Sequence, residues 1–181
     1  ICKKVYGFEA NPKNFELLNY NISLNKINNV DVKNIAIGEI EKKVNINHNT
    51  INTGNSSIAL TVNKHESLID MKKLDNIISE ERIDMIIMDI EGYEINAIKG
   101  ATNTLKKTNY FYVEYAPEQL NTFGMKKEDF IDCIKDIYTN MYMLDNNKLI
   151  RYENKSWINH LENLPERRGL LLNLLFSNKI I

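Results

Sequence analysis

The stretch that decides the fold is Met85-Ile86-Ile87-Met88-Asp89-Ile90-Glu91-Gly92-Tyr93-Glu94. It continues an apolar run that begins at Ile83 and is typical of a buried β-strand, and a helical pattern follows over residues 93–105. In an open α/β sheet, ligands bind at the carboxyl ends of strands, where helix N-termini also point. Asp89 and Glu91 are therefore expected where the chemistry of such a fold is usually done.

Length and composition indicate an ordinary globular protein. The chain has 181 residues, is 43% hydrophobic and 26% charged, and carries a net charge of −1. We expect one domain over residues 1–181. It opens without Met, immediately before a predicted strand, and is expected to be part of a longer protein with an N-terminally incomplete domain.

The same numbers exclude several partners. Lys and Arg are dispersed without a basic stripe, so no nucleic-acid partner is expected. No apolar run approaches the ~20 residues of a spanning helix, so no membrane contact is expected. Cys2 and Cys133 lie too far apart in sequence to suggest a disulfide scaffold, which favours a cytoplasmic location. The sequence does not reveal the oligomeric state.

Strands and helices alternate over the first two-thirds of the chain. Strands are predicted at 5–8, 30–37, 43–47, 58–62, 83–88, 109–115, 141–144, 149–152 and 170–176, with a further one at 68–71. Helices are predicted from Pro12 to Leu24 and at 74–78, 93–105 and 126–137. This order predicts an α/β fold, a Rossmann-like doubly wound and mostly parallel sheet with an antiparallel far edge.

The acids that follow strands are the candidate functional residues. Glu9 closes the first strand, and an acid at such a position commonly hydrogen-bonds ribose hydroxyls. Glu114, near the end of a later strand, faces the same edge and is a candidate for acceptor binding. The alternative for Glu9, Asp89 and Glu91 is that they only complement the dipoles of the helices that follow.

Other polar residues give weaker signals. Ser56 and Ser57 lie in a loop able to fold over the pocket, or in an ordinary turn. His48, His65 and His160 are isolated, so no metal site is expected.

Four segments resemble the FkbM family of S-adenosylmethionine-dependent methyltransferases, in order and in spacing. They are Val5-Tyr6-Gly7-Phe8-Glu9-Ala10-Asn11-Pro12, Asn34-Ile35-Ala36-Ile37-Gly38, Leu74-Asp75-Asn76-Ile77-Ile78 and Met88-Asp89-Ile90-Glu91-Gly92-Tyr93-Glu94. The last is the most specific, and the resemblance extends from about Val5 to Phe176.

The resemblance implies a methyltransferase domain that uses S-adenosylmethionine to methylate a hydroxyl of a small molecule or glycan. It implies that Glu9 and Asn11 hold the cofactor ribose and its loop, and that Ala36 and Ile37 lie by the adenine. Asp89 would contact the cofactor. Asp89 and Glu91 together would line the reacting centre as catalytic residues, and Ser57 and Glu114 would bind the acceptor. Asp75 is expected to act mainly as a helix N-cap.

The chain departs from the family pattern at two places. The family usually opens with a strand and a Gly-rich turn that cradle the cofactor, and this chain has no such element before Val5. A basic residue commonly precedes the Asp-x-Glu-Gly element, and here Met88 stands there. A non-catalytic interaction domain that lost cofactor binding is therefore the alternative function. A nicotinamide-dependent oxidoreductase is a third possible function, because such enzymes also use an acidic residue to bind the cofactor ribose.

Overall fold

The computed structural model describes residues 2–47, 57–58, 67–145, 148–165 and 168–180. Its strands are β1 Val5–Phe8, β2 Val30–Lys33, β3 Ala36–Ile37, β4 Lys42–Asn47, β5 Ser57–Ile58, β6 Ser67–Lys72, β7 Ile83–Met88, β8 Thr108–Tyr115, β9 Asn140–Asp145, β10 Lys148–Tyr152 and β11 Leu172–Ser177. Its helices are α1 Pro12–Leu24, α2 Glu94–Lys99, α3 Thr102–Lys106, α4 Pro117–Thr122, α5 Lys127–Ile134 and α6 Ser156–Glu162, with a short 3₁₀ turn at Leu74–Asn76.

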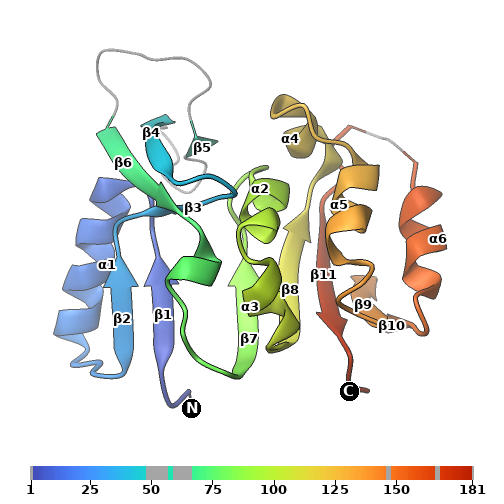
Figure 1. Cartoon of the computed structure of the whole chain (residues 1–181), viewed down its shortest axis with the longest axis horizontal. Helices are drawn as coiled ribbons and strands as arrows, with labels where there is room; N and C mark the ends of the chain where they lie inside the picture. The colour runs from blue at the N-terminus through green and yellow to red at the C-terminus, as the bar shows by residue number, and fades with distance from the viewer. Residues whose placement is uncertain (1, 48–56, 59–66, 146–147, 166–167, 181) are drawn as a thin grey trace.

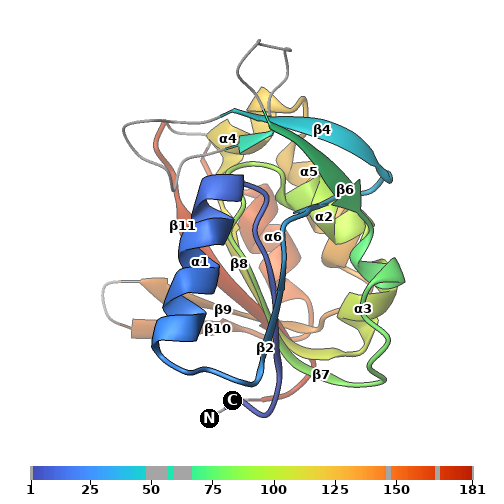
Figure 2. The same cartoon turned by 90° about the vertical axis from the view of Figure 1, so that its left-hand side faces the viewer.

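The described strands form three hydrogen-bonded sheets. They are β1-β2, β10-β9-β11-β8-β7 and β3-β6-β4-β5. Figure 1 shows β2, β1, β7, β8 and β11 in one layer, with the β3–β6 sheet at one end of it. Helices α2, α3, α5 and α6 lie on one face of this layer, and α1 lies on the other (Figure 2). The chain is thus a mixed α/β protein.

The pairing corrects one expectation. Three of the eight ladders among the described residues are parallel and five are antiparallel, so a mostly parallel sheet is wrong for this part of the chain. The antiparallel far edge is confirmed, but it begins already at β8, because β11 returns along it. A hairpin of β9 and β10 then extends that edge.

The main core lies between the five-stranded sheet and its helices. Phe111 of β8, Phe176 of β11, Phe130 of α5 and Trp157 of α6 are all 0% exposed. The Trp157 and Phe176 rings meet edge to face at 5.1 Å, an arrangement that aromatic pairs favour. Helix α5 turns its apolar side inward because its large apolar residues recur three and four positions apart.

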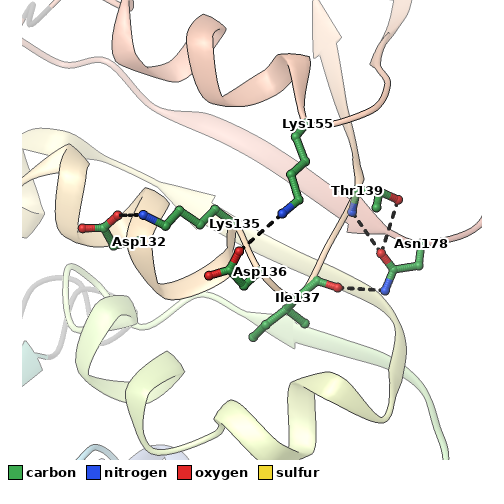
Figure 3. Close-up of polar contacts among 7 residues, drawn as sticks. All are labelled: Asp132, Lys135, Asp136, Ile137, Thr139, Lys155 and Asn178. Carbon is green, nitrogen blue, oxygen red and sulfur yellow. Dashed lines mark hydrogen bonds and ion pairs between the residues drawn. The ribbon is translucent and has the colours of Figure 1, made fainter.

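The C-terminal end of β11 is fixed by a polar contact. The Asn178 side chain accepts a hydrogen bond from the Thr139 backbone N–H at 2.9 Å and donates one to the Ile137 carbonyl at 2.8 Å. Figure 3 shows these bonds beside the Lys155–Asp136 ion pair, which joins α6 to the same turn. The turn between α5 and β9 is thereby tied to the strand that separates β9 from β8.

Two predicted elements are divided in the structure. The expected strand over 30–37 breaks after Lys33, and β3 pairs with β6 in another sheet. The expected helix over 93–105 breaks at Gly100, where a Cβ atom would lie 2.1 Å from the Gly38 carbonyl oxygen. Helices α4 and α6 are additions to the prediction, and the expected strand over 58–62 falls mostly outside the described residues.

Candidate functional site

The loop after β1 presents Glu9 and is held by two asparagines. Asn11 is 2% exposed and caps α1, since its side chain accepts a hydrogen bond from the Lys13 N–H at 3.0 Å. Pro12 then occupies the first helical position, where its missing N–H is not needed. The Glu9 carboxylate accepts a hydrogen bond from the Asn11 N–H at 2.7 Å. Asn34 donates to the Glu9 carbonyl at 2.7 Å, which fixes this loop against the end of β2.

Ala36 and Ile37 form β3, at the side of this loop. Ala36 is 4% exposed and pairs with Met71 of β6, whereas Ile37 is half-buried. The small apolar cluster around Ala36 also includes Ala10 and Tyr93 as partly buried members. The Glu9 loop, β3 and the loop after β7 therefore share one packing cluster.

The loop after β7 has a left-handed backbone at two successive residues. Glu91 has φ 57° and Gly92 has φ 95°, a region that favours glycine and is uncommon for other residues. Glu94 holds this turn. It is 2% exposed, and its carboxylate accepts hydrogen bonds from the backbone N–H groups of Ile90 at 3.0 Å and Gly92 at 3.2 Å. Burial raises the pKa of Glu94, because a site away from water disfavours the charged form of the carboxyl group.

Helix α4 closes the other side of the same turn. Gln119 donates a hydrogen bond from its side chain to the Glu91 carboxylate at 2.8 Å. Its backbone leaves no room for a side chain at Gly92, because a Cβ there would lie 2.7 Å from the Gln119 carbonyl oxygen. The Tyr93 ring packs edge to face on Phe123, just after α4, at 5.2 Å. The direction in which Glu91 points is therefore set by α4.

Four carboxylates gather at the ends of β7 and β8. The register pairs Met88 with Val113, so Asp89 and Glu114 follow neighbouring positions of parallel strands. Burial, and after it the charges of the nearby acids, raise the pKa of Glu114 to about 7. Those acids are, in order of effect, Asp89, Glu91 and Glu94. Burial and the charge of Asp89 also raise the pKa of Glu91.

The predicted residues thus fall into two groups. The structure brings Asp89, Glu91 and Glu114 together, and it places Glu9 and Asn11 in one loop beside Ala36 and Ile37. Figure 1 shows β1, β7 and β8 running in one direction, so both groups lie at the same edge of the strand layer. The strand position of Ser57 is described, but its side chain is not, so its role remains a prediction. Ser56, His48 and His65 lie outside the described residues.

Asp75 does not cap the 3₁₀ turn to which it belongs, whose N-cap position is Lys73, but it binds the start of α3 from a distant segment. Its carboxylate accepts the backbone N–H groups of Asn103 at 3.0 Å and Thr104 at 2.7 Å, in the first turn of α3. The expected N-cap role is therefore wrong, because the N-cap position of α3 is Ala101 and Asp75 reaches that helix only through the tertiary fold.

Several residues of the site carry no signal in the sequence pattern. Gln119 acts through a tertiary contact with Glu91 that no spacing rule predicts. Tyr93 belongs to a motif already quoted, but only the fold shows that it contacts Phe123 and Met71. Asn34 belongs to a motif already quoted, but only the fold shows that its amide holds the Glu9 loop.

The described residues form neither a metal-ligand cluster nor a membrane-spanning helix. No group of three or more His, Cys, Asp or Glu side chains there is arranged to hold a metal ion. None of the helices in that part of the chain combines the length and apolar composition needed to cross a bilayer.

Comparison with known proteins places these features in a family. A family model described as the methyltransferase FkbM domain matches residues 1–146, which is most of the chain. The chain belongs to the FkbM methyltransferase family. The resemblance of its four sequence segments to that family is confirmed.

Individual relatives agree with the family. A 2-O-methyltransferase, NoeI of Sinorhizobium fredii, is 40% identical over 55 residues, which are 29% of this chain and 23% of that protein. The crystal structure of the methyltransferase FkbM from Methylobacillus flagellatus matches with a TM-score of 0.55 at 19% identity. That match covers 97% of this chain and 36% of the solved one, so it supports the fold. The chain spans about a quarter to a third of the length of these relatives.

Proposed function

We propose that this FkbM-family chain carries the acceptor-side acids of an S-adenosylmethionine-dependent O-methyltransferase that acts on a hydroxyl of a small molecule or glycan. The observation that carries the proposal is the carboxylate group formed by Asp89, Glu91 and Glu114 at the ends of β7 and β8, where Glu114 has a pKa of about 7. A general base works best when its pKa lies near the operating pH. The family membership and the printed activity of the NoeI relative support the reaction class.

The residues present fit such a cofactor in three respects. Glu9 offers a carboxylate on a loop fixed by Asn11 and Asn34, as a ribose diol requires. The half-buried Ile37, next to the buried Ala36 in β3, offers a small apolar surface beside it, suited to a flat base. After burial, the charges of nearby acids raise the pKa values of Glu114 and Glu91, and no cation is among the causes, so a bound sulfonium would relieve this repulsion.

When bound, S-adenosylmethionine supplies a methyl group on a positively charged sulfur. The residues of the chain orient the acceptor and accept its hydroxyl proton. We place the proton on the Glu114 carboxylate, because one oxygen of Glu91 already accepts a hydrogen bond from Gln119. Asp89 and Glu91 would then contact the cofactor and the acceptor and contribute negative charge to the site. A positioned base of this kind contributes about 10²–10⁴-fold to the rate.

The first test is calorimetric titration with S-adenosylmethionine, with NAD as the control ligand. The proposal expects binding of the methyl donor and none of NAD. Glu9→Ala should then weaken binding. Binding of NAD alone would refute the proposal in favour of an oxidoreductase. Binding of neither ligand would refute the proposal in favour of the interaction domain.

The second test concerns the base. In a methyl-transfer assay with a hydroxyl acceptor, Glu114→Gln should lower turnover by about 10²–10⁴-fold. Glu81→Gln, an exposed glutamate just before β7, is the matched control and should keep full turnover. The wild-type rate should rise with pH through about 7 as the Glu114 carboxyl ionises. A full rate for Glu114→Gln would show that it is not the base.

A further inference from the structure

Tyr93 contacts two different parts of the fold from within the acid turn, which we define as residues 89–94. Its ring packs edge to face on Phe123, the residue after α4, with the ring centres 5.2 Å apart. Its hydroxyl lies 3.9 Å from the Met71 sulfur, on β6 of the small sheet. The side chain is half-buried, so both contacts are made partly out of water. Tyr93 therefore joins the small sheet to α4 through one side chain.

Met71 extends this contact to the strand proposed to lie by the adenine. It is 1% exposed and pairs with Ala36 in the parallel ladder of β3 and β6. It also packs on Gly38, just after β3, because a Cβ atom at Gly38 would collide with the Met71 sulfur. A movement of β3 is thus passed to Met71, since close-packed interiors transmit displacements.

Two further observations place Tyr93 beside the cofactor side of the site. Ala10, which follows Glu9, packs against the same small apolar cluster as Tyr93. Burial, and after it the charge of Glu39, raise the pKa of the Tyr93 hydroxyl. Glu39 lies two residues beyond β3, so the hydroxyl lies near the end of that strand. The Glu9 loop and β3 therefore meet Tyr93 in one cluster.

On the acceptor side, Tyr93 meets the helix that directs Glu91. Phe123 ends α4, and Gln119 of the same helix donates a hydrogen bond to the Glu91 carboxylate at 2.8 Å. A displacement of the Tyr93 ring against Phe123 would therefore move α4 and, with it, the hydrogen bond that orients Glu91. The contacts run without a gap from β3 to the acceptor acid.

We propose that Tyr93 is a positioning residue that couples the cofactor side of the site, at Glu9 and Ile37, to the direction of Glu91 on the acceptor side. A ligand that orders one side then reduces the entropy lost in ordering the other, so the two ligands bind with positive coupling. The inference rests on the proposed function for the nature of the two ligands, whereas the link through Tyr93 is a property of the protein alone.

Amide hydrogen exchange of the ligand-free 181-residue chain tests the link. The reporter is the Ile90 amide, whose hydrogen bond to Glu94 holds the acid turn. Met71→Ala removes a contact of Tyr93 and should speed exchange of this amide at least about threefold, as expected for residues in one packed network. In the Tyr93→Leu background, Met71→Ala should have no further effect. Ile69→Ala, two positions earlier on β6 and in the same cluster, is the matched control and should leave Ile90 exchange unchanged.

Two other variants complete this experiment. Tyr93→Phe keeps the ring that packs on Phe123 and should behave as the wild type, because the contact between the hydroxyl and the sulfur is long. Phe123→Leu replaces Tyr93→Leu as the background if the latter does not fold. The same effect of Met71→Ala with and without Tyr93 would overturn the proposal. So would an effect of Ile69→Ala as large as that of Met71→Ala.

Adenosine tests the coupling, because it carries the base and the ribose but neither the sulfur nor the amino acid part of the cofactor. At saturating adenosine, Ile90 exchange should slow at least about fivefold in the wild type and in Tyr93→Phe, and should not change in Tyr93→Leu. Binding without this slowing in the wild type would overturn the coupling and leave the proposed function standing. Equal slowing in all three proteins would overturn the role of Tyr93. Failure of adenosine to bind would overturn both the coupling and the proposed cofactor side, while the ligand-free exchange decides the link separately.

Discussion

The effect of alanine at Gly92, in the turn after β7, can be predicted by comparison with two other glycines, Gly124 and Gly100. The three differ in backbone φ and in the space around the position of a Cβ atom. Gly92 has φ +95°, and a Cβ there would lie 2.7 Å from the carbonyl oxygen and 2.9 Å from the carbonyl carbon of Gln119. Gly124 has φ +72° and would meet nothing within 4 Å. Gly100 has an ordinary φ of −79°, but a Cβ there would lie 2.1 Å from the carbonyl oxygen of Gly38. Alanine at each position separates the cost of backbone strain from that of crowding.

The magnitudes follow from these contacts. A left-handed backbone costs a non-glycine residue about 1–2 kcal/mol, so Gly124→Ala should lower the free energy of unfolding by about that much. Crowding of a packed site costs about 1–3 kcal/mol, and more where backbone must move, which is the expectation for Gly100→Ala. Gly92→Ala carries both costs and should lose about 2–5 kcal/mol.

Urea unfolding of the three variants checks this ranking, with the free energy of unfolding taken from the midpoint and slope. Gly92→Ala should also weaken the protection from exchange of the Ile90 amide, because the turn that Glu94 holds is displaced. If Gly92→Ala lost no more stability than Gly124→Ala, the close contact with Gln119 would not constrain the turn, and the account of how α4 directs Glu91 would be wrong.

Three further predictions concern carboxylates. The pKa of Glu114 is raised to about 7 from an ordinary 4.5, so its contribution to stability is lost as pH rises from about 4.5 to about 7. Glu114→Gln should therefore raise the urea midpoint at pH 8 more than at pH 5, and an equal shift with Glu81→Gln would contradict this. Asp75→Ala should cost about 0.5–2 kcal/mol through the hydrogen bonds lost at the start of α3, seen as a lower urea midpoint, while the exposed Asp84→Ala should be nearly neutral. Glu94→Ala should lower the free energy of unfolding by about 1–3 kcal/mol for each of the two backbone amides left without an acceptor. Glu94→Gln keeps an acceptor oxygen and should lower it less in the same urea titration. Identical losses for the two variants would argue against these hydrogen bonds.

Local patterns predicted most single elements of this chain. The apolar run at 83–88 is β7, the alternating run at 109–115 lies within β8, and the Phe130–Ile134 spacing lies on α5. Such elements are predictable because the side-chain period of a strand or helix is written directly in the order of residues. The same holds for Pro12 at the start of α1, whose role depends on adjacent residues only.

The divisions within predicted elements depend on distant contacts. Residues 30–37 read as one strand, yet the chain leaves β2 at Asn34, whose side chain bonds the Glu9 loop. Residues 93–105 read as one helix, yet Gly100 meets Gly38, about sixty residues earlier in the chain. Neither partner can be found from the local period, because each contact is made by backbone or amide groups that have no hydrophobic signature.

By itself, the sequence determined the family, the strands that end in Glu9 and Asp89, and the acids expected at their ends. Only the tertiary structure decided that β11 returns antiparallel beside β8, that Gln119 directs Glu91, and that Glu114 has the most perturbed pKa of the acids there. The physical reason is the separation, along the sequence, of the residues that interact. A residue's own period and its neighbours set the local conformation, whereas register, burial and the repulsion between carboxylates depend on segments that meet only after folding.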